Sequence, residues 1–123
     1  VRSRFESDAR LSDDGAVVIL DLLLGMVERL IRPDQQRPEP LRFRFEARDS
    51  RLDSFDIAVQ GGRARHEPVG ADPPVATFRG DAHNFVLAFY GRQPLERAVA
   101  AGDVDVRGDR ELASAFSRWC QGI

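Results

Sequence analysis

The stretch of sequence that decides the fold is residues 78–123, which read FRGDAHNFVLAFYGRQPLERAVAAGDVDVRGDRELASAFSRWCQGI. Apolar residues recur at helical spacing in 82–90 and again in 94–101, and a glycine follows each segment. Residues 103–107 alternate charged residues with valines, which predicts a strand, and apolar residues i, i+3, i+4 and i+7 from Leu112 predict an amphipathic helix. Large aromatic side chains and few groups suited to catalysis favour a domain with an apolar interior over one that breaks bonds.

The ends of these helices carry their own signals. Asp81 precedes 82–90 and Asp109 precedes the last helix, where a carboxylate can accept hydrogen bonds from the free amides of the first turn. Gly91 is the expected left-handed stop of the first helix, and Pro94 suits the first turn of the second. The stretch therefore predicts three helices and one strand.

Upstream of this stretch the period of the apolar residues is two. In 41–48 and 55–59 apolar residues alternate with polar or small ones, which predicts strands with one buried face and one wet face. Gly61-Gly62 is a hairpin signal because both positions tolerate positive φ, and a weaker strand is predicted over 63–68. With a short fourth strand over 75–79, we expect an antiparallel meander with one apolar face.

The first element is predicted to be a helix over 15–31. Its apolar stripe consists of Leu20, Leu23, Leu24, Val27, Leu30 and Ile31. Valines and an isoleucine at 17–19 weaken the pattern at its start, and the prolines within 33–40 end it. Residues 1–14 lack an apolar period and are expected to be a flexible lead-in, so 15–123 is expected to form a single domain.

This order of elements predicts a two-layer α+β domain, with a five-stranded, mainly antiparallel sheet and helices packed on one face. A helical layer on a curved sheet can leave an apolar cleft, and such clefts are typical small-molecule sites. The residues expected to bind a ligand there are Phe43, Phe45, Phe55, Ile57, Phe85, Phe89, Phe116 and Trp119. The same side chains are suited to a filled core, and the sequence leaves both arrangements open.

Composition excludes several classes of function. A net charge of −2 argues against non-specific nucleic-acid binding by this chain. No apolar run approaches the roughly 20 residues needed to span a bilayer, and the first residues do not resemble a signal peptide. The single cysteine, Cys120, excludes an internal disulfide and fits a reducing cytoplasm, which is the expected location.

No group of residues has the spacing of a known catalytic or metal site. The polar candidates are Asp81, His83, Asn84, His66, Ser114, Ser117 and Cys120. Metal sites need three or four convergent ligands, and nucleophilic catalysis needs a base and an orienting group, neither of which this spacing suggests. Lysine is absent, so no Schiff-base amine is available. We expect no catalytic residue, no metal and no cofactor.

Arginines gather on the polar face of the predicted sheet. They are Arg42, Arg44, Arg48, Arg63 and Arg65. The favoured interpretation is a solvated outer face, balanced by Glu46, Asp56 and Glu67. The alternative is contact with a partner domain or with the acidic head group of a ligand.

The run D-x-x-N-F-x-x-x-x-Y-G-R-x-P-L-E-R-A-V-A-x-G-D-V-x-V-x-G-D-R at residues 81–110 resembles the sterol carrier protein family. More narrowly, it resembles the divergent bacterial form often found behind winged-helix regulators of the HxlR type. The segments RFRFEARDS and DSFDIAVQGGRA are similar to that family's first hairpins, so the likeness covers about 41–116. The resemblance implies a five-stranded sheet backed by helices, a hydrophobic tunnel for lipids or other apolar molecules, and no catalytic residues. The chain has no recognisable helix-turn-helix, so any contact with DNA would need a domain outside these residues.

Two functions are compatible with these features. One is a binding module for an apolar small molecule or lipid, serving as the sensor half of a regulator, and it predicts an apolar cavity of several hundred Å³. The other is a structural domain with a filled core that forms a homodimer through a sheet edge or the helix over 20–31, and it predicts an exposed apolar patch.

Overall fold

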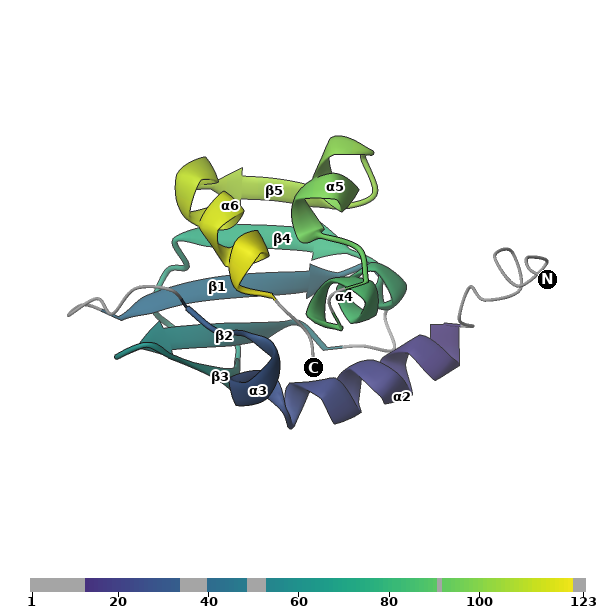
Figure 1. Ribbon diagram of the computed structural model, residues 1–123, viewed down its shortest axis with the longest axis horizontal. Coiled ribbons are helices and arrows are strands. Elements are labelled where there is room, and N and C mark those ends of the chain that lie inside the picture. Colours follow the sequence, from purple (N-terminus) through teal and green to yellow (C-terminus); the bar gives the residue numbers. More distant parts are fainter. Residues whose placement is uncertain (1–12, 34–39, 49–52, 91, 121–123) are drawn as a thin grey trace.

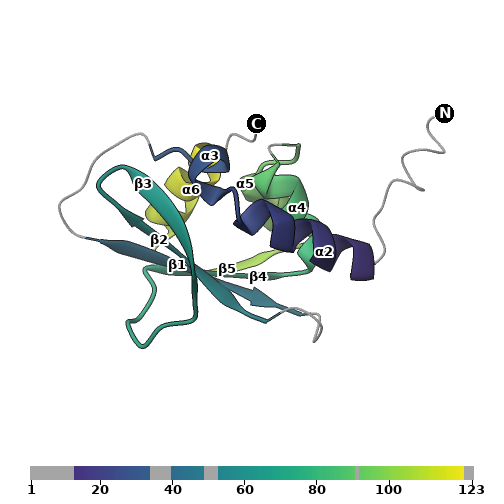
Figure 2. The same cartoon turned by 90° about the horizontal axis from the view of Figure 1, so that it is seen from below.

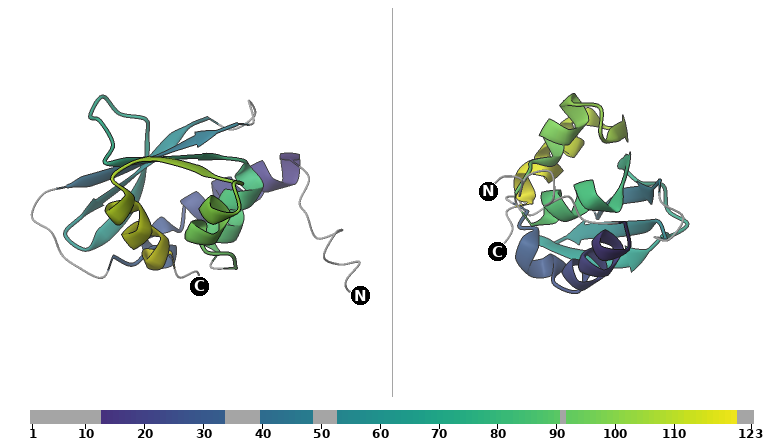
Figure 3. Two further views of the ribbon diagram at one scale, coloured as in Figure 1. Left: turned by 90° about the horizontal axis from the view of Figure 1, so that it is seen from above. Right: turned by 90° about the vertical axis from the view of Figure 1, so that its right-hand side faces the viewer.

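The computed structural model describes residues 13–33, 40–48, 53–90 and 92–120 (Figure 1). In chain order its elements are α2 (Asp13–Leu24), α3 (Val27–Leu30), β1 (Leu41–Ala47), β2 (Phe55–Gln60), β3 (Arg63–Pro68), β4 (Ala76–Gly80), α4 (Ala82–Phe89), α5 (Leu95–Ala100), β5 (Asp105–Gly108) and α6 (Arg110–Trp119). One five-stranded sheet forms a layer, and the helices gather on one of its faces (Figure 3). The predicted two-layer α+β class is confirmed.

The strand order in the sheet is β3-β2-β1-β4-β5. The pairs β1–β2, β2–β3 and β4–β5 are antiparallel, whereas β4 runs parallel to β1. The sheet is therefore mainly antiparallel, as predicted, but the expected meander is wrong at its fourth strand. Because β4 lies on the far side of β1, the connection over 69–75 must cross the sheet, and it does so on the face opposite the helices (Figure 2).

The predicted helix over 15–31 is two helices rather than one. A turn at Gly25 and Met26 separates α2 from α3, and their amides donate to the carbonyls three residues back. Gly25 is a poor helix former, and the break lets α2 pack on α4 while α3 packs on β3. All six residues of the predicted apolar stripe are buried. The expected flexible lead-in lies outside the described residues up to position 12, and Asp13–Leu24 shows that its last two residues are helical.

Of the two predicted aspartate N-caps, one is confirmed and the other is wrong. The Asp109 carboxylate caps α6, accepting from the Leu112 amide at 3.0 Å, as expected. Asp81 occupies the N-cap of α4, but its carboxylate makes no capping hydrogen bond, so that prediction is wrong. Its main-chain carbonyl accepts from the amides of Asn84 and Phe85 instead. The helix stop predicted at Gly91 lies outside the described residues.

The core between sheet and helices is an aromatic cluster centred on Phe45. The Phe45 ring lies with its centroid 5.1–5.5 Å from those of its five neighbours, which are Phe55, Phe78, Phe85, Phe89 and Phe116. Trp119 joins the cluster through Phe43 and Phe116. Ring contacts at these separations stabilise packing beyond the burial of apolar area alone, so this cluster helps to hold the two layers together.

Candidate ligand-binding groove

The structure brings together all eight residues that the sequence predicted as ligand-binding. They come from β1, β2, α4 and α6, and each is at most 3% exposed. Seven of them are aromatic, and every one of these rings contacts at least one other ring of the set. Phe55 differs from the rest in its position, because it also lines a groove that opens at the surface. Whether these eight side chains bind a ligand stays a prediction.

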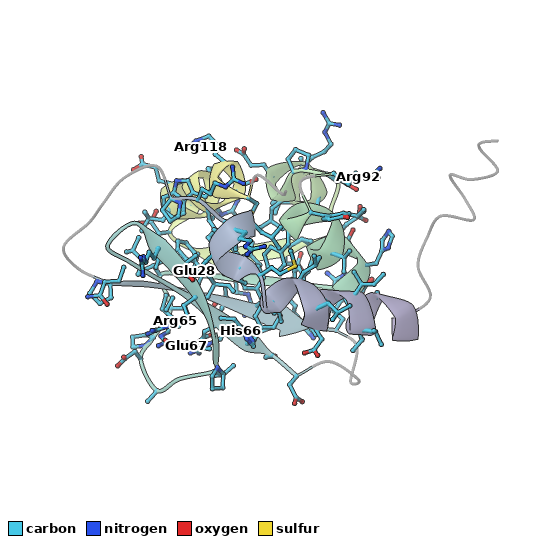
Figure 4. The ribbon with its side chains drawn as sticks, turned by 60° about the horizontal axis from the view of Figure 1, so that its bottom comes forward. Glu28, Arg65, His66, Glu67, Arg92 and Arg118 are labelled. Atoms are coloured by element: carbon cyan, nitrogen blue, oxygen red, sulfur yellow. The ribbon has the colours of Figure 1, made fainter. Side chains whose placement is uncertain are left out.

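The groove lies between edge strand β3 and the two helices α2 and α3. Strand alternation points Ala64, His66 and Pro68 towards the helical layer, opposite Val59, Ile57 and Phe55 of β2. Ala64 is buried under α3, but His66 and Pro68 are exposed. Since α2 packs against α4, it does not close over this end of β3 (Figure 4).

Two adjoining hollows make up the groove and share Leu24 and His66. The first, under α2, has a volume of about 470 Å³, and the second, beside α3, about 680 Å³. Apolar walls in the first come from Val17, Val18 and Leu24 on α2 and from Phe55 and Pro68 on the sheet. Volumes of this size fall within the range of small-molecule sites.

Polar side chains form the rim of the first hollow. They are Asp21, Asp53, Ser54 and His66, and all are exposed. The His66 ring lies 5.5 Å from Phe55, edge towards face. Neither Asp21 nor Asp53 is joined by its carboxylate to another residue in the described part of the chain. The second hollow instead mixes Glu28 with Arg29 and Arg65.

Sequence reasoning missed most of this groove. His66 was considered only among the polar candidates for a catalytic or metal site, and Val17, Asp21 and Asp53 were not proposed as binding residues. A usable signal was present in β3, where a histidine and a proline occupy positions that should face the interior. Such residues on the inner face indicate that the edge of the sheet is not covered.

On the opposite face, a buried carboxylate organises the arginines. Asp56 is 0% exposed and accepts hydrogen bonds from Arg42 at 2.7 Å, Arg44 at 2.9 Å and the Gly70 amide at 3.0 Å. Arg44 also donates to the carbonyls of Gly70 and Asp72, so the network holds the crossing connection against the sheet. Burial alone would raise the pKa of Asp56, but the hydrogen bonds from Arg44, Gly70 and Arg42 outweigh it and lower that pKa.

The predicted solvated outer face is therefore only partly correct. Glu67 balances Arg42 and Arg65, at 2.6 and 3.1 Å, and the hydrogen bond from Arg42 is the largest cause that lowers the pKa of Glu67. Asp56, in contrast, is covered rather than solvated, because the connection over 69–75 lies above it. In the antiparallel meander expected from the sequence, the connection between β3 and β4 would not cross this face, so Asp56 was expected to be exposed to solvent.

Other polar candidates are scattered. Among the described residues, no three of the histidine, cysteine, aspartate and glutamate side chains are grouped so as to hold a metal ion. Burial raises the pKa of the Cys120 thiol, which keeps it protonated and weakly nucleophilic at neutral pH. The Ser117 hydroxyl accepts from the Glu96 amide and so tethers α5 to α6. No helix in the described ranges is long and apolar enough to cross a membrane.

Known proteins share this arrangement. Residues 32–121 match the SCP-2 sterol transfer family. The UbiJ-SCP2 ubiquinone synthesis protein is 16% identical, with 85% of this chain and 91% of that chain covered and a TM-score of 0.57. Palmitated SCP2L2 from Aedes aegypti is 14% identical, with coverages of 81% and 88% and a TM-score of 0.56. The stereoselective inverting sec-alkylsulfatase Pisa1 from Pseudomonas sp. is 12% identical, with a TM-score of 0.67. The match covers 84% of this chain but 16% of the sulfatase.

At these identities the solved structures establish the fold, and the likeness to the sulfatase shows the fold as a small part of a larger protein. No match was found among curated proteins. The predicted resemblance to sterol carrier proteins is confirmed, whereas the narrower likeness to forms found behind HxlR-type regulators stays a prediction. The chain belongs to the SCP-2 sterol transfer family.

Proposed function

We propose that this chain is a non-catalytic binding module for an apolar small molecule or lipid, which enters through the groove between β3 and α2–α3. The observation that carries the proposal is the uncovered end of β3. There, exposed His66 and Pro68 leave an opening directly beside Phe55, the ring of the aromatic cluster that borders the groove. Membership of a sterol transfer family supports a lipid as the ligand class.

In this proposal the apolar walls take up the ligand tail. Val17, Val18 and Leu24 would contact it from α2, and Phe55 would form the floor. Behind Phe55 stand Phe45 at 5.2 Å and Phe89 at 6.3 Å between ring centroids, so a longer tail would advance by displacing rings of the cluster. The driving force would be removal of apolar surface from water.

Two measurements test the proposal. One is native mass spectrometry of protein that has been incubated with a lipid extract and repurified, and the other is thermal melting in the presence of fatty alcohols, fatty acids and sterols. We expect a bound apolar molecule and a higher melting temperature with at least one of these classes. A protein that carries no such molecule, and whose melting none of them changes, would contradict the proposal.

A matched pair of variants locates the site. Val18 and Leu22 lie one turn apart on α2, 61% and 66% exposed, but only Val18 lines the groove. Val18→Ser should weaken binding about fivefold, corresponding to about 1 kcal/mol of lost apolar contact, while Leu22→Ser should leave binding unchanged. Equal effects of the two substitutions would place the ligand elsewhere.

A second candidate function is a dimerisation domain with a filled core. The close ring contacts around Phe45 and the exposed Val18 and Leu22 on α2 favour it. In that case Leu22→Asp should turn a dimer into a monomer in analytical ultracentrifugation. A wild-type chain that stays monomeric at high concentration would remove this candidate.

We also propose a sensor role in the cytoplasm. The resemblance of 81–110 to domains behind winged-helix regulators supports the role, and the free Cys120 thiol supports the location. DNA would be contacted only by another domain. In the full-length protein, addition of the ligand should then change the affinity for operator DNA, and an unchanged affinity would contradict the sensor role.

A further inference from the structure

The charged side chains that line the hollow under α2 are of one sign. Asp21 projects from one wall and Asp53 from the other, and no arginine lines this hollow. Both carboxylates are exposed, and neither makes an ion pair or hydrogen bond with a described residue. The rim is completed by Ser54 and His66, which can exchange hydrogen bonds with a ligand.

Several arginines of the sheet form ion pairs with carboxylates outside the hollow under α2. Arg42 and Arg44 bind Asp56 on the opposite face of the sheet, and Arg48 pairs with Asp105 at 3.0 Å. Arg65, which also borders the second hollow, pairs with Glu67 (Figure 4). Among the described residues, no arginine therefore lines the hollow under α2 to balance its two carboxylates, and of the two hollows Arg29 and Arg65 border only the second.

The two carboxylates flank the place where a ligand head group would lie. Asp21 is one helical turn from both Val17 and Leu24, on the side of α2 that faces the groove. Asp53 stands two residues before Phe55, which forms the floor. A ligand whose tail points at Phe55 would thus leave its head between these side chains, at the boundary with water.

We propose that this groove prefers single-chain amphiphiles with a hydroxyl or amine head over those with a carboxylate or phosphate head. The inference rests on the proposed function. An ammonium group can donate hydrogen bonds to both carboxylates and a hydroxyl group to one of them, whereas an anionic head is repelled by both. At a separation of about 7 Å in a water-rich site, each carboxylate lowers the affinity for an anion roughly threefold, so the two together give a difference of about tenfold.

Three probes with one C12 tail test this preference: dodecanol, dodecylamine and laurate. Isothermal titration below the micelle concentrations of dodecylamine and laurate, and below the solubility limit of dodecanol, should give dodecylamine at least as tight as dodecanol, and laurate about tenfold weaker than dodecanol. Raising the salt from 50 to 500 mM should narrow the gap, because screening weakens charge repulsion at exposed sites.

Variants assign the effect to the two residues. The double variant Asp21→Asn/Asp53→Asn should bring laurate to within about threefold of dodecanol and leave dodecanol itself unchanged. The control Asp103→Asn/Glu111→Gln removes the same charge from exposed positions outside the groove and should keep the tenfold gap.

The outcomes separate the inference from the proposed function. If the three probes bind equally, or laurate binds most tightly, or both double variants change the gap alike, the head-group preference is wrong while the groove remains an apolar site. If none of the three probes binds, the proposed function fails and the preference fails with it.

Discussion

Asp56→Ala removes the carboxylate that joins the β3–β4 connection to the sheet. Asp56 is fully buried and accepts hydrogen bonds from Arg42, Arg44 and the Gly70 amide. Removing one partner of a buried ion pair typically costs 3–5 kcal/mol, because an uncompensated charge stays behind. The side chains of Arg42 and Arg44 are 20% and 19% exposed, and Arg42 keeps Glu67 as a partner. We therefore expect a loss of about 2–4 kcal/mol in the free energy of unfolding.

Urea unfolding, monitored by circular dichroism and by Trp119 fluorescence, measures this loss. The m-value is expected to stay unchanged, so the loss appears as a lower urea midpoint. Asp56→Asn keeps the shape of the side chain and one acceptor, and should cost about 1–2 kcal/mol. Asp105→Ala is the control, because its pair with Arg48 has side chains 63% and 37% exposed, and it should cost less than about 0.5 kcal/mol. The reasoning is refuted if Asp56→Ala unfolds at the wild-type urea concentration, or if Asp105→Ala costs as much.

The lowered pKa of Asp56 gives the same network a pH signature. A carboxyl group with a depressed pKa in the folded state contributes stability above its ordinary pKa, near 4, and loses that contribution as pH falls through the folded value. The difference in unfolding free energy between wild type and Asp56→Asn should thus be constant from about pH 7 to 5 and shrink below about pH 4. Glu67 titrates in both proteins and cancels to first order. A difference that stays undiminished as the pH falls below about 4 would contradict this account.

Three further predictions concern the core and the helix ends. Phe45→Ala should cost about 3–5 kcal/mol, because it empties the centre of the aromatic cluster; an unfolding midpoint near wild type would contradict the assigned packing. Gly80→Ala would place a Cβ 2.9 Å from a methyl of buried Val104, so a loss of about 1–3 kcal/mol is expected in the same assay, and a neutral result would show that β4 can shift. Asp109→Ala removes the side-chain cap of α6 and should lower the free energy of unfolding by about 1 kcal/mol. Asp81 makes no such capping hydrogen bond, so Asp81→Ala should lower it by less.

Local periodicity was enough to predict the strands and the last helix. The two-residue alternation in β1 and β2 and the stripe from Leu112 to Trp119 depend only on neighbouring residues. Both place large side chains in the core as expected, and Leu112 itself is half-buried. The eight proposed ligand-binding residues gather in one cluster for the same reason.

Features that depend on distant partners could not be predicted in this way. An alternating strand has the same pattern whether its neighbour is parallel or antiparallel, so the pairing of β4 with β1 was missed. That error hid the burial of Asp56, which exists only because the connection over 69–75 crosses above it. The break at Gly25 carried a local signal, but the apolar stripe continues across it and favoured a single helix.

The groove is also a consequence of tertiary packing. It exists because α2 packs on α4 and leaves the end of β3 open. The apolar pattern of a single segment does not show which element that segment packs against. The exposed inner-face residues His66 and Pro68 were the available clue.

Ligand titration of ¹⁵N-labelled protein, followed by amide chemical shifts, tests the central claim most directly. With dodecanol as the probe, we expect the first and largest changes at Val17, Phe55 and His66, which border the hollow under α2. Changes that spread later to Phe45 would report displacement of the aromatic cluster. Changes confined to Arg42 and Ala58 on the opposite face, or no changes at saturating probe, would contradict the assignment of the groove as the ligand site.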